Sequence, residues 1–445
     1  MTQPRLPAVL TALIALSAAS PGASQPAAIP QFPPGPGFAG VAGSPEEAAR
    51  ITAICGPNRN AQDGYAPKPA FPGQTRAPIV HGTQGYAVQT VAKIDRPFGM
   101  DFLPNGHMLV TFRNGGMRVV TTDGHVSDLL AGVPKMVNPR LGSGLYDVIA
   151  DRNFARNRTI YFTFHTKLPG DAAAMGRIVR ARLSPDEKGL TDLKVLREGA
   201  DIQPRRIVQA RDGTLLIMSA GDLADVAHDP QLPANQVGKV LRIATDGSIP
   251  KDNPFLKDPT ANPAVFALGF RDIHAAVIHP TTGELWAAEN QPRGGDRLEA
   301  IRAGKNYGMP VISYGRQNNG AFINGGKTAQ PGIEQPLYYW NPSIAPSGIA
   351  VYTGAAFPAW KGDVFIGAMS GQQLVRLKMK GEHVAAEEKL LLDRCERIKV
   401  VKQGPDGDLY ILTDQMPPAQ NEILRLAPDK TIPQPRPAPG GKPAG

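Results

Sequence analysis

Six segments of this chain share one hydrophobic pattern, in which a turn rich in Gly, Asp or Asn leads into an alternating or wholly apolar run. They are Leu103–Phe112, Phe154–Phe164, Ala210–Asp222, Pro280–Glu289, Ala359–Ala368 and Gly404–Asp414, spaced at roughly 45 to 80 residues. Such turns feed β-strands. Since a propeller blade is a four-stranded sheet of about 40 to 50 residues, the spacing predicts an all-β fold, a six-bladed β-propeller. A β-sandwich with long loops is the alternative, but so regular a hairpin signal favours the propeller.

The composition agrees with many turns and short elements. The chain of 445 residues contains 48 Gly and 44 Pro, which interrupt long helices. Its formal net charge of +9 raises the question of nucleic-acid binding. The lysines and arginines are scattered, however, with no basic helix and no interleaved aromatics, so we expect no nucleic-acid partner.

The N-terminus has the outline of a secretory signal peptide over residues 1–24. A basic start at Arg5 precedes the apolar run Leu6–Ala19, and the small residues Gly22–Ser24 follow. The run is too short to span a bilayer, and no other segment is long and apolar enough, so we expect no membrane span and a periplasmic or secreted protein. A disordered apolar tail on a cytosolic protein is the alternative.

The flanks of the repeats have a different composition from the repeats themselves. Residues 25–85 form a Pro/Gly-rich extension with one helical candidate at Ser44–Cys55, and residues 428–445 form a tail of similar composition that we expect to be disordered. The propeller is therefore expected over residues 86–427.

The two cysteines of the chain are Cys55 and Cys395. In an exported protein an isolated pair meets an oxidising environment, so a disulfide could tie the extension to a late strand. Two buried free thiols are the alternative.

The segment Gly283–Gly315 is the richest in candidate chemistry. A short aromatic strand runs into the turn Gln291–Asp296, which combines two glycines, a proline, an arginine and a carboxylate. Backbone carbonyls of such a turn can point at a ligand or a cation. A polar hairpin loop that faces water is the alternative.

Seven motifs in order give the chain a family resemblance over roughly Tyr86–Leu426. They read RPFGMDFLPNG, GLYDVIADRNFARNRTIYFTF, GKVLRIATDGSIPKDNPF, ALGFRDIHA, GELWAAENQPRGGDRLEAIRAGKNYGMPVISYG, PLYYWNPSIAPSGIAVYTG and RIKVVKQGPDGDLYILTD. With them the chain resembles the soluble sugar dehydrogenases that use pyrroloquinoline quinone (PQQ), the glucose/sorbosone dehydrogenase family. The resemblance implies a six-bladed propeller with PQQ at one end of its channel, a Ca²⁺ ion beside the quinone, hydride transfer from an aldose, and an electron acceptor.

The resemblance also implies roles for particular residues. Arg271 matches an arginine that stabilises charge on the quinone oxygen, and Asp222 matches an aspartate behind the catalytic histidine. Arg397 and Lys399 fall where two basic residues meet the quinone carboxylates.

The same resemblance points to two calcium sites. Main-chain oxygens of Gln291 and Pro292 would bind the ion near the quinone, although Gln291 stands where the family usually has Gly. Asp296 and the carbonyl of Tyr307 match a second, structural site, but Arg297 replaces its glutamate and disfavours an ion there.

The chain departs from the family at the chemistry itself. Ile202 stands at the position of the general-base histidine, and Gly142 at that of a substrate-side glutamine. Loss of a general base typically costs a factor of about 10² to 10⁴ in rate. His274, where the family has Gln, is a candidate substitute base, whereas Asp272, in place of an Asn, would be repelled by an anionic quinone.

Two functions fit these observations. One is an exported PQQ-dependent dehydrogenase that oxidises an aldose or a related sugar or aldehyde at an altered site. The other is a noncatalytic exported propeller that binds a sugar or a protein in its channel. A hydrolytic propeller such as a lactonase would need an inward cluster of acidic and Asn side chains, which the sequence does not assemble.

Overall fold

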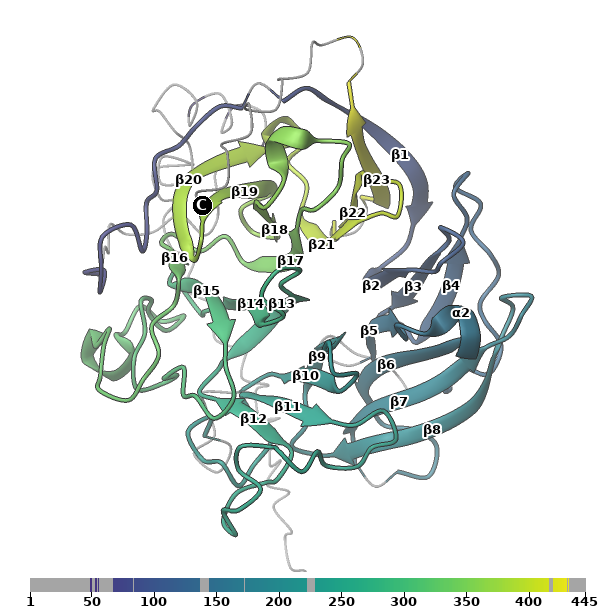
Figure 1. The fold of residues 1–445 in the computed structure, drawn as a ribbon, viewed down its shortest axis with the longest axis horizontal. Coiled ribbons are helices and arrows are strands. Elements are labelled where there is room, and N and C mark those ends of the chain that lie inside the picture. The colour runs from purple at the N-terminus through teal and green to yellow at the C-terminus, as the bar shows by residue number, and fades with distance from the viewer. Residues whose placement is uncertain are drawn as a thin grey trace, which may run out of the picture. The chain divides into compact units, whose positions relative to one another are not determined.

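The strands pair into six small antiparallel sheets arranged around a common centre in the computed structural model (Figure 1). The structure describes residues 67–429 apart from 83, 137–143, 172, 222–228 and 416–418, and also residues 49, 53, 55 and 431. Within each sheet the strands follow one another from the centre outward. The first three sheets consist of β2 (Pro97–Phe102), β3 (Met108–Phe112) and β4 (Gly116–Val120); of β5 (Gly144–Ala150), β6 (Thr159–Thr166), β7 (Met175–Leu183) and β8 (Leu190–Gly199); and of β9 (Pro204–Gln209), β10 (Leu215–Ser219), β11 (Lys239–Ile243) and β12 (Val265–Leu268). The last three consist of β13 (Asp272–Ile278), β14 (Leu285–Asn290), β15 (Asp296–Ile301) and β16 (Tyr338–Trp340); of β17 (Pro346–Val351), β18 (Val364–Ala368), β19 (Gln373–Lys380) and β20 (His383–Leu390); and of β21 (Ile398–Gln403), β22 (Leu409–Thr413), β23 (Asn421–Pro428) and β1 (Tyr86–Ile94).

Helical structure in the described part of the chain is confined to short segments. They are α2 (Phe154–Asn157), η3 (Ile323–Gly326), η4 (Pro358–Trp360) and η5 (Leu392–Arg394), together with the helical residues Ala49, Ala53 and Cys55. The last three belong to the candidate helix Ser44–Cys55. No helix among the described residues has the length and apolarity needed to cross a bilayer.

The six innermost strands β2, β5, β9, β13, β17 and β21 contact one another in a closed ring. The ring closes because β1, from the start of the domain, pairs antiparallel with β23 from its end, with Tyr86 opposite Pro428 and Ile94 opposite Asn421. The first blade has three strands among the described residues and each of the others has four. The all-β prediction of a six-bladed propeller is therefore confirmed, and the sandwich alternative is excluded.

Each of the six turn-and-strand repeats supplies the same element of its blade. They contain β3, β6, β10, β14, β18 and β22, the strands that pair with the innermost ones. These strands lie between two neighbours of their own sheet and between two adjacent blades, which explains why most of their residues are apolar. The hydrophobic pattern thus marks a strand of each blade that is buried along almost its whole length.

Six apolar clusters fill the spaces between adjacent blades. The cluster between the fourth and fifth blades, for example, joins Trp286 of β14 to Ile349 of β17 and Ile366 of β18. Because every blade shares a cluster with each neighbour, the blades stabilise one another and hold the channel geometry.

The segment before β1 lies along the outer strands of the fourth and fifth blades. The main-chain N–H of Tyr339 donates to the Gln74 carbonyl at 2.9 Å, and that of Val80 donates to the Glu387 carbonyl at 2.8 Å. A disulfide joins Cys55 to Cys395, with their Cα atoms 5.3 Å apart. The expected signal peptide and most of the C-terminal tail lie outside the described residues.

Candidate functional site

Every innermost strand has a β-bulge near its first residue, at one end of the channel that we call the upper end. All six strands run in the same direction away from this end, because each is the first strand of an up-and-down sheet. A bulge inserts an extra residue and redirects side chains. The bulges fall at Phe98–Gly99, Tyr146–Asp147, Arg205, His274, Ser347 and Lys399, one position or pair in each blade.

Phe98 is the aromatic centre of this ring of bulges. Its side chain is buried, and the Tyr146 ring packs edge-on against it at a centroid distance of 4.8 Å. Three basic side chains lie around the Phe98 ring: Lys399 Nζ at 4.4 Å, and the guanidinium carbons of Arg206 and Arg113 at 5.1 and 5.2 Å from its centroid. The aromatic face thus offsets part of the cost of gathering positive charge in the channel.

Arg206 links all six blades beneath this ring. The guanidinium donates to Asp147 Oδ1 at 3.0 Å and to the main-chain carbonyls of His274, Ser347, Lys399 and Phe98 at 2.6, 3.1, 3.0 and 3.5 Å. These acceptors belong to the innermost strands of the five other blades. Since the side chain is buried, the bonds stabilise the channel at the point where the blades meet.

Arg397 and Lys399, which the resemblance assigns to the quinone carboxylates, are both brought to the upper end beside Asp414. Arg397 Nε donates to the Asp414 carbonyl at 3.0 Å, and Lys399 Nζ lies 4.0 Å from Asp414 Oδ2. Burial lowers the pKa of Lys399 well below its usual range, and only part of this effect is offset by Asp414. A negatively charged ligand would favour the protonated amine.

Arg271 lies at the same end, just before β13. Its Nη1 donates to the main-chain oxygen of Asn290 at 3.0 Å, and its own main-chain N–H donates to the Glu289 carboxylate. Both bonds attach Arg271 to the end of β14, immediately before the turn that begins at Gln291. The structure therefore places Arg271 beside the candidate metal-binding turn.

Asp296 organises that turn. Its carboxylate accepts from the main-chain N–H of Gln291 at 2.9 Å, from the Ser343 hydroxyl at 2.7 Å, and from the N–H groups of Ile344 and Ala345, both at 2.8 Å. Burial raises the pKa of Asp296 to about 6, although these donors favour the ionised form. All these donors hold the carboxylate in place, so its role in the structure is to fix the main chain at Gln291 and at residues 343–345.

The carbonyls of Gln291 and Pro292 remain the candidate calcium ligands. Gln291 is not among the residues with a left-handed backbone, so the change from Gly requires no strained φ. Among the described residues, no three His, Cys, Asp or Glu side chains converge on a common point that would hold a metal ion. An ion at this turn would thus depend on main-chain oxygens and on the ligand that it contacts.

Arg297 occupies the second candidate calcium site with its own charge. The guanidinium is buried between Glu289 and Glu299: Nε lies 2.8 Å from Glu289 Oε2 and 3.2 Å from Glu299 Oε1. Its Nη1 donates to the Tyr307 carbonyl at 2.7 Å, so the guanidinium binds the oxygen that matches a calcium ligand of the second site. Burial raises the pKa of Glu299, against the influence of Arg297.

The resemblance also singles out Ile202, Gly142 and Asp222, of which the structure describes Ile202. Ile202 is completely buried and packs with Ile178 and Ile207 in the apolar cluster between the second and third blades. It therefore supplies packing and no proton acceptor. Gly142 and Asp222 lie outside the described residues.

His274 and Asp272, in contrast, meet in the channel. His274 Nε2 lies 3.0 Å from Asp272 Oδ2, and Asp272 Oδ1 accepts from Arg205 Nε at 3.0 Å. Arg205 Nη1 in turn donates to the Tyr146 hydroxyl at 2.8 Å. Sequence reasoning missed Arg205, Tyr146 and Phe98. The only local signal was the adjacent pair Arg205-Arg206, because neighbouring side chains of a regular strand face opposite sides of the sheet.

Many buried polar atoms in the blades nearest Arg271 and Lys399 have no hydrogen-bond partner in the described part of the chain. They are His274 Nδ1, Asn290 Oδ1, both amide atoms of Gln291, Ser347 Oγ, Ser370 Oγ and both amide atoms of Gln373. They lie in the innermost strands β13 and β17, at the upper ends of β14 and β19, or in the turns next to these ends, all in the fourth and fifth blades. Buried polar groups are normally paired, so this concentration indicates a site for a polar ligand.

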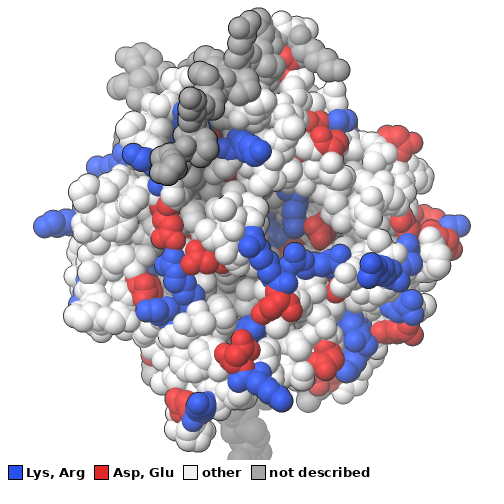
Figure 2. All heavy atoms as spheres, in the orientation of Figure 1, with Lys and Arg blue, Asp and Glu red and all other residues white. Residues whose placement is uncertain are grey.

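The charge of the upper end defines that ligand further. Among the described residues, Asp272 pairs with Arg205, and Asp414 lies beside Arg397 and Lys399, while Arg113 and Arg271 also lie at this end. On the face shown in Figure 2, basic and acidic side chains lie side by side around the central hollow. This concentration of basic side chains fits a planar anion with several carboxylates, and PQQ is such a molecule.

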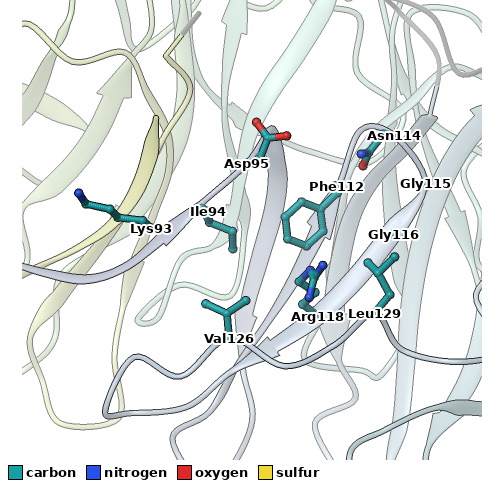
Figure 3. A pocket seen from close by; sticks show the side chains of 10 residues that line it. All are labelled: Lys93, Ile94, Asp95, Phe112, Asn114, Gly115, Gly116, Arg118, Val126 and Leu129. Carbon is teal, nitrogen blue, oxygen red and sulfur yellow. The ribbon is translucent and has the colours of Figure 1, made fainter. Parts of the chain in front are cut away.

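Other hollows of the molecule lie apart from these residues. The cavity in Figure 3, of about 330 Å³, lies between the end of β1 and the β3–β4 hairpin, with Phe112, Arg118 and Leu129 among the side chains around it. A cavity of about 290 Å³ occupies the opposite end of the channel, where the innermost strands finish. None of the residues predicted from the sequence to bind cofactor or metal lines either cavity.

Comparison with known proteins agrees with the geometry. The chain is similar to the aldose sugar dehydrogenase YliI of Escherichia coli (33% identity over 345 residues, 76% of this chain and 91% of that protein). The crystal structure of the soluble E. coli aldose sugar dehydrogenase in its apo-form matches with a TM-score of 0.71 at 32% identity, covering 77% of this chain and 100% of that one. The PQQ-bound aldose sugar dehydrogenase of Streptomyces coelicolor matches with a TM-score of 0.61 at 25% identity, covering 79% and 99%. The family model for glucose/sorbosone dehydrogenase matches residues 94–425, and the chain belongs to this family.

Proposed function

We propose that this protein is an exported PQQ-dependent dehydrogenase that oxidises an aldose, or a related sugar or aldehyde, by hydride transfer to the quinone. The observation that carries the proposal is the concentration of unpartnered buried polar atoms and basic side chains at the upper end of the channel. The relative from S. coelicolor binds PQQ in a structure of the same fold. The apolar run at Leu6–Ala19 supports export.

Different residues of the site would bind different parts of the quinone and the metal ion. Arg397 and Lys399 would hold carboxylates of the quinone, and Arg271 would stabilise negative charge on its oxygen. Main-chain oxygens of Gln291 and Pro292 would hold a Ca²⁺ ion, with Asp296 keeping their backbone in place. When bound, the quinone accepts the hydride; an external electron acceptor is then needed to reoxidise it.

Reconstitution with PQQ and Ca²⁺ tests this function directly. Binding is followed by quenching of tryptophan fluorescence, and turnover by reduction of a dye with a panel of aldoses and aldehydes. We expect saturable PQQ binding, weakened about 10- to 100-fold in Arg397→Gln because a charge-assisted hydrogen bond is worth roughly 1.5–3 kcal/mol. Arg152→Gln is the matched control, since Arg152 lies at the opposite end of the channel.

The outcomes separate the functional classes. If the wild-type protein binds no PQQ in the presence of Ca²⁺, the quinoprotein proposal is wrong. If it binds PQQ but reduces no dye with any sugar or aldehyde, it is a noncatalytic binding propeller. That second function is favoured by one observation, the burial of Ile202 in an apolar cluster at the family's general-base position.

A further inference from the structure

A chain of hydrogen bonds crosses three neighbouring blades at the level of the bulges. It begins at His274 on β13, passes through Asp272 of the same strand to Arg205 on β9, and ends at Tyr146 on β5. The three donor–acceptor distances are 3.0, 3.0 and 2.8 Å. Three of its four members are bulge residues, so the chain exists because the bulges turn these side chains into the channel.

The chain determines which nitrogen of His274 carries the proton. Burial opposes ionisation of Asp272, but the bond with His274 and the Arg205 guanidinium hold the pKa of this carboxyl well below its usual range. An ionised carboxylate only accepts, so the hydrogen between it and His274 belongs to Nε2. In the neutral imidazole the lone pair is then on Nδ1, which is buried and has no partner among the described residues.

His274 is neutral under ordinary conditions. Burial lowers its pKa to about 4, with Asp272 acting in the opposite direction. The charged groups that face it are Asp272 from its own strand, Arg205 from β9 and Lys399 from β21. Its Nδ1 is therefore unprotonated at neutral pH, which a general base requires before it can take the proton of a substrate.

We propose that His274 Nδ1 accepts the proton of the substrate hydroxyl, and that Asp272 and Arg205 are positioning residues that fix this tautomer. The inference rests on the dehydrogenase function proposed above. As the substrate C–H bond breaks and its electron pair leaves with the hydrogen to the quinone, the O–H bond breaks, a carbonyl forms and the proton moves to Nδ1. Asp272 then stabilises the imidazolium, as a carboxylate behind a histidine does in hydrolases.

Arg205 makes the arrangement rigid. It holds Asp272 Oδ1 through Nε and is itself held by Tyr146, whose ring lies 5.1 Å from the guanidinium carbon. The other carboxylate oxygen is thereby directed at His274. A base that replaces the one lost at Ile202 thus comes from the fourth blade, with support from the second and third.

The first test reads the tautomer without any quinone. The full-length protein is labelled with ¹⁵N-histidine, and its ring nitrogens are followed by NMR, with the His274 signals identified from their loss in His274→Gln. We expect a protonated Nε2, an unprotonated Nδ1 and no titration from pH 8 to pH 5. Asp272→Asn and Arg205→Met should each produce the other tautomer in part. A protonated Nδ1 in the wild-type protein overturns the proposal.

The second test uses the quinone-loaded protein. We expect His274→Gln to lower kcat by about 10² to 10⁴ with PQQ affinity unchanged within about threefold, and Arg205→Met to lower kcat by roughly tenfold. His279→Gln is the matched control, because His279 follows the same strand and packs on Trp286 outside the channel. A His274→Gln protein that keeps its kcat overturns the assignment, whereas a wild-type protein that binds no PQQ overturns only the dehydrogenase function and leaves the tautomer result intact.

Discussion

Replacement of Arg206 by methionine tests whether one side chain holds the six blades together. Met keeps much of the apolar stem but loses every donor, so Asp147 Oδ1 and four main-chain carbonyls lose a partner at once. Removing one member of a buried ion pair costs about 3–5 kcal/mol. Asp147 still accepts a hydrogen bond from the N–H of Ile207 at 3.1 Å and can take up a proton. The free energy of unfolding should therefore fall by an amount in this range, which is less than the sum of five separate hydrogen bonds.

Such a loss is a large share of a typical stability of about 5–15 kcal/mol. Urea unfolding followed by fluorescence measures it: for a protein of this size, with m near 3–4 kcal/mol/M, the midpoint should fall by roughly 1 M. Arg206→Lys keeps the charge beside Asp147 but loses the forked guanidinium. Its urea midpoint should therefore lie between those of the wild type and Arg206→Met.

The matched control is Arg182→Met. Arg182 Nη1 lies 3.6 Å from Asp192 Oδ2 in an ion pair whose side chains are 56% and 64% exposed. Exposed pairs contribute about 0–1 kcal/mol, so this variant should unfold almost as the wild type does. If Arg206→Met also stays within about 1 kcal/mol of wild type, the bonds of Arg206 do not stabilise the channel, and the reasoning is refuted.

Three further predictions concern other parts of the molecule. The double variant Cys55→Ser/Cys395→Ser should lower the free energy of unfolding by about 2–4 kcal/mol. Thiol titration of the denatured wild-type protein should detect thiols only after reduction. Free thiols before reduction would contradict the Cys55–Cys395 bond. Because burial raises the pKa of Glu299 above its ordinary 4.5, the folded state binds more protons than the unfolded one, so wild-type stability should fall as the pH rises from 5 to 8. In Glu299→Gln the free energy of unfolding, measured with urea, should change less with pH. If its pH dependence is the same as in the wild type, another group causes it. Asp296→Asn places an amide NH₂ against an N–H donor, which should cost about 1–3 kcal/mol of stability. The variant should also bind PQQ more weakly in the presence of Ca²⁺ in the fluorescence titration. Unchanged affinity would show that the position of the Gln291 main chain does not depend on Asp296.

The candidate site was only partly accessible from the sequence. Arg271, Arg397 and Lys399 belong to short motifs, and the structure brings all three to the upper end of the channel. Asp296 matches a ligand of a second calcium site that Arg297 was expected to disfavour, and in the structure four donors engage its carboxylate. That difference depends on residues 343–345, which are distant in sequence and reach Asp296 only when the fourth and fifth blades pack together.

The sequence by itself determined the architecture of the blades. A turn followed by an apolar strand is a local signal, because both turn geometry and burial of the second strand depend on neighbouring residues, and six such signals define six blades. The motifs likewise determined the family, which the match over residues 94–425 shows.

Only the tertiary structure decided how the channel is lined. A bulge adds one residue to one strand relative to its partner, so Arg205, His274 and Lys399 face the channel because of a pairing register that no single strand encodes. The tautomer of His274 depends in the same way on Arg205 from another blade. Ring closure, completed by β1 and β23 from opposite ends of the chain, brings these groups within hydrogen-bonding distance.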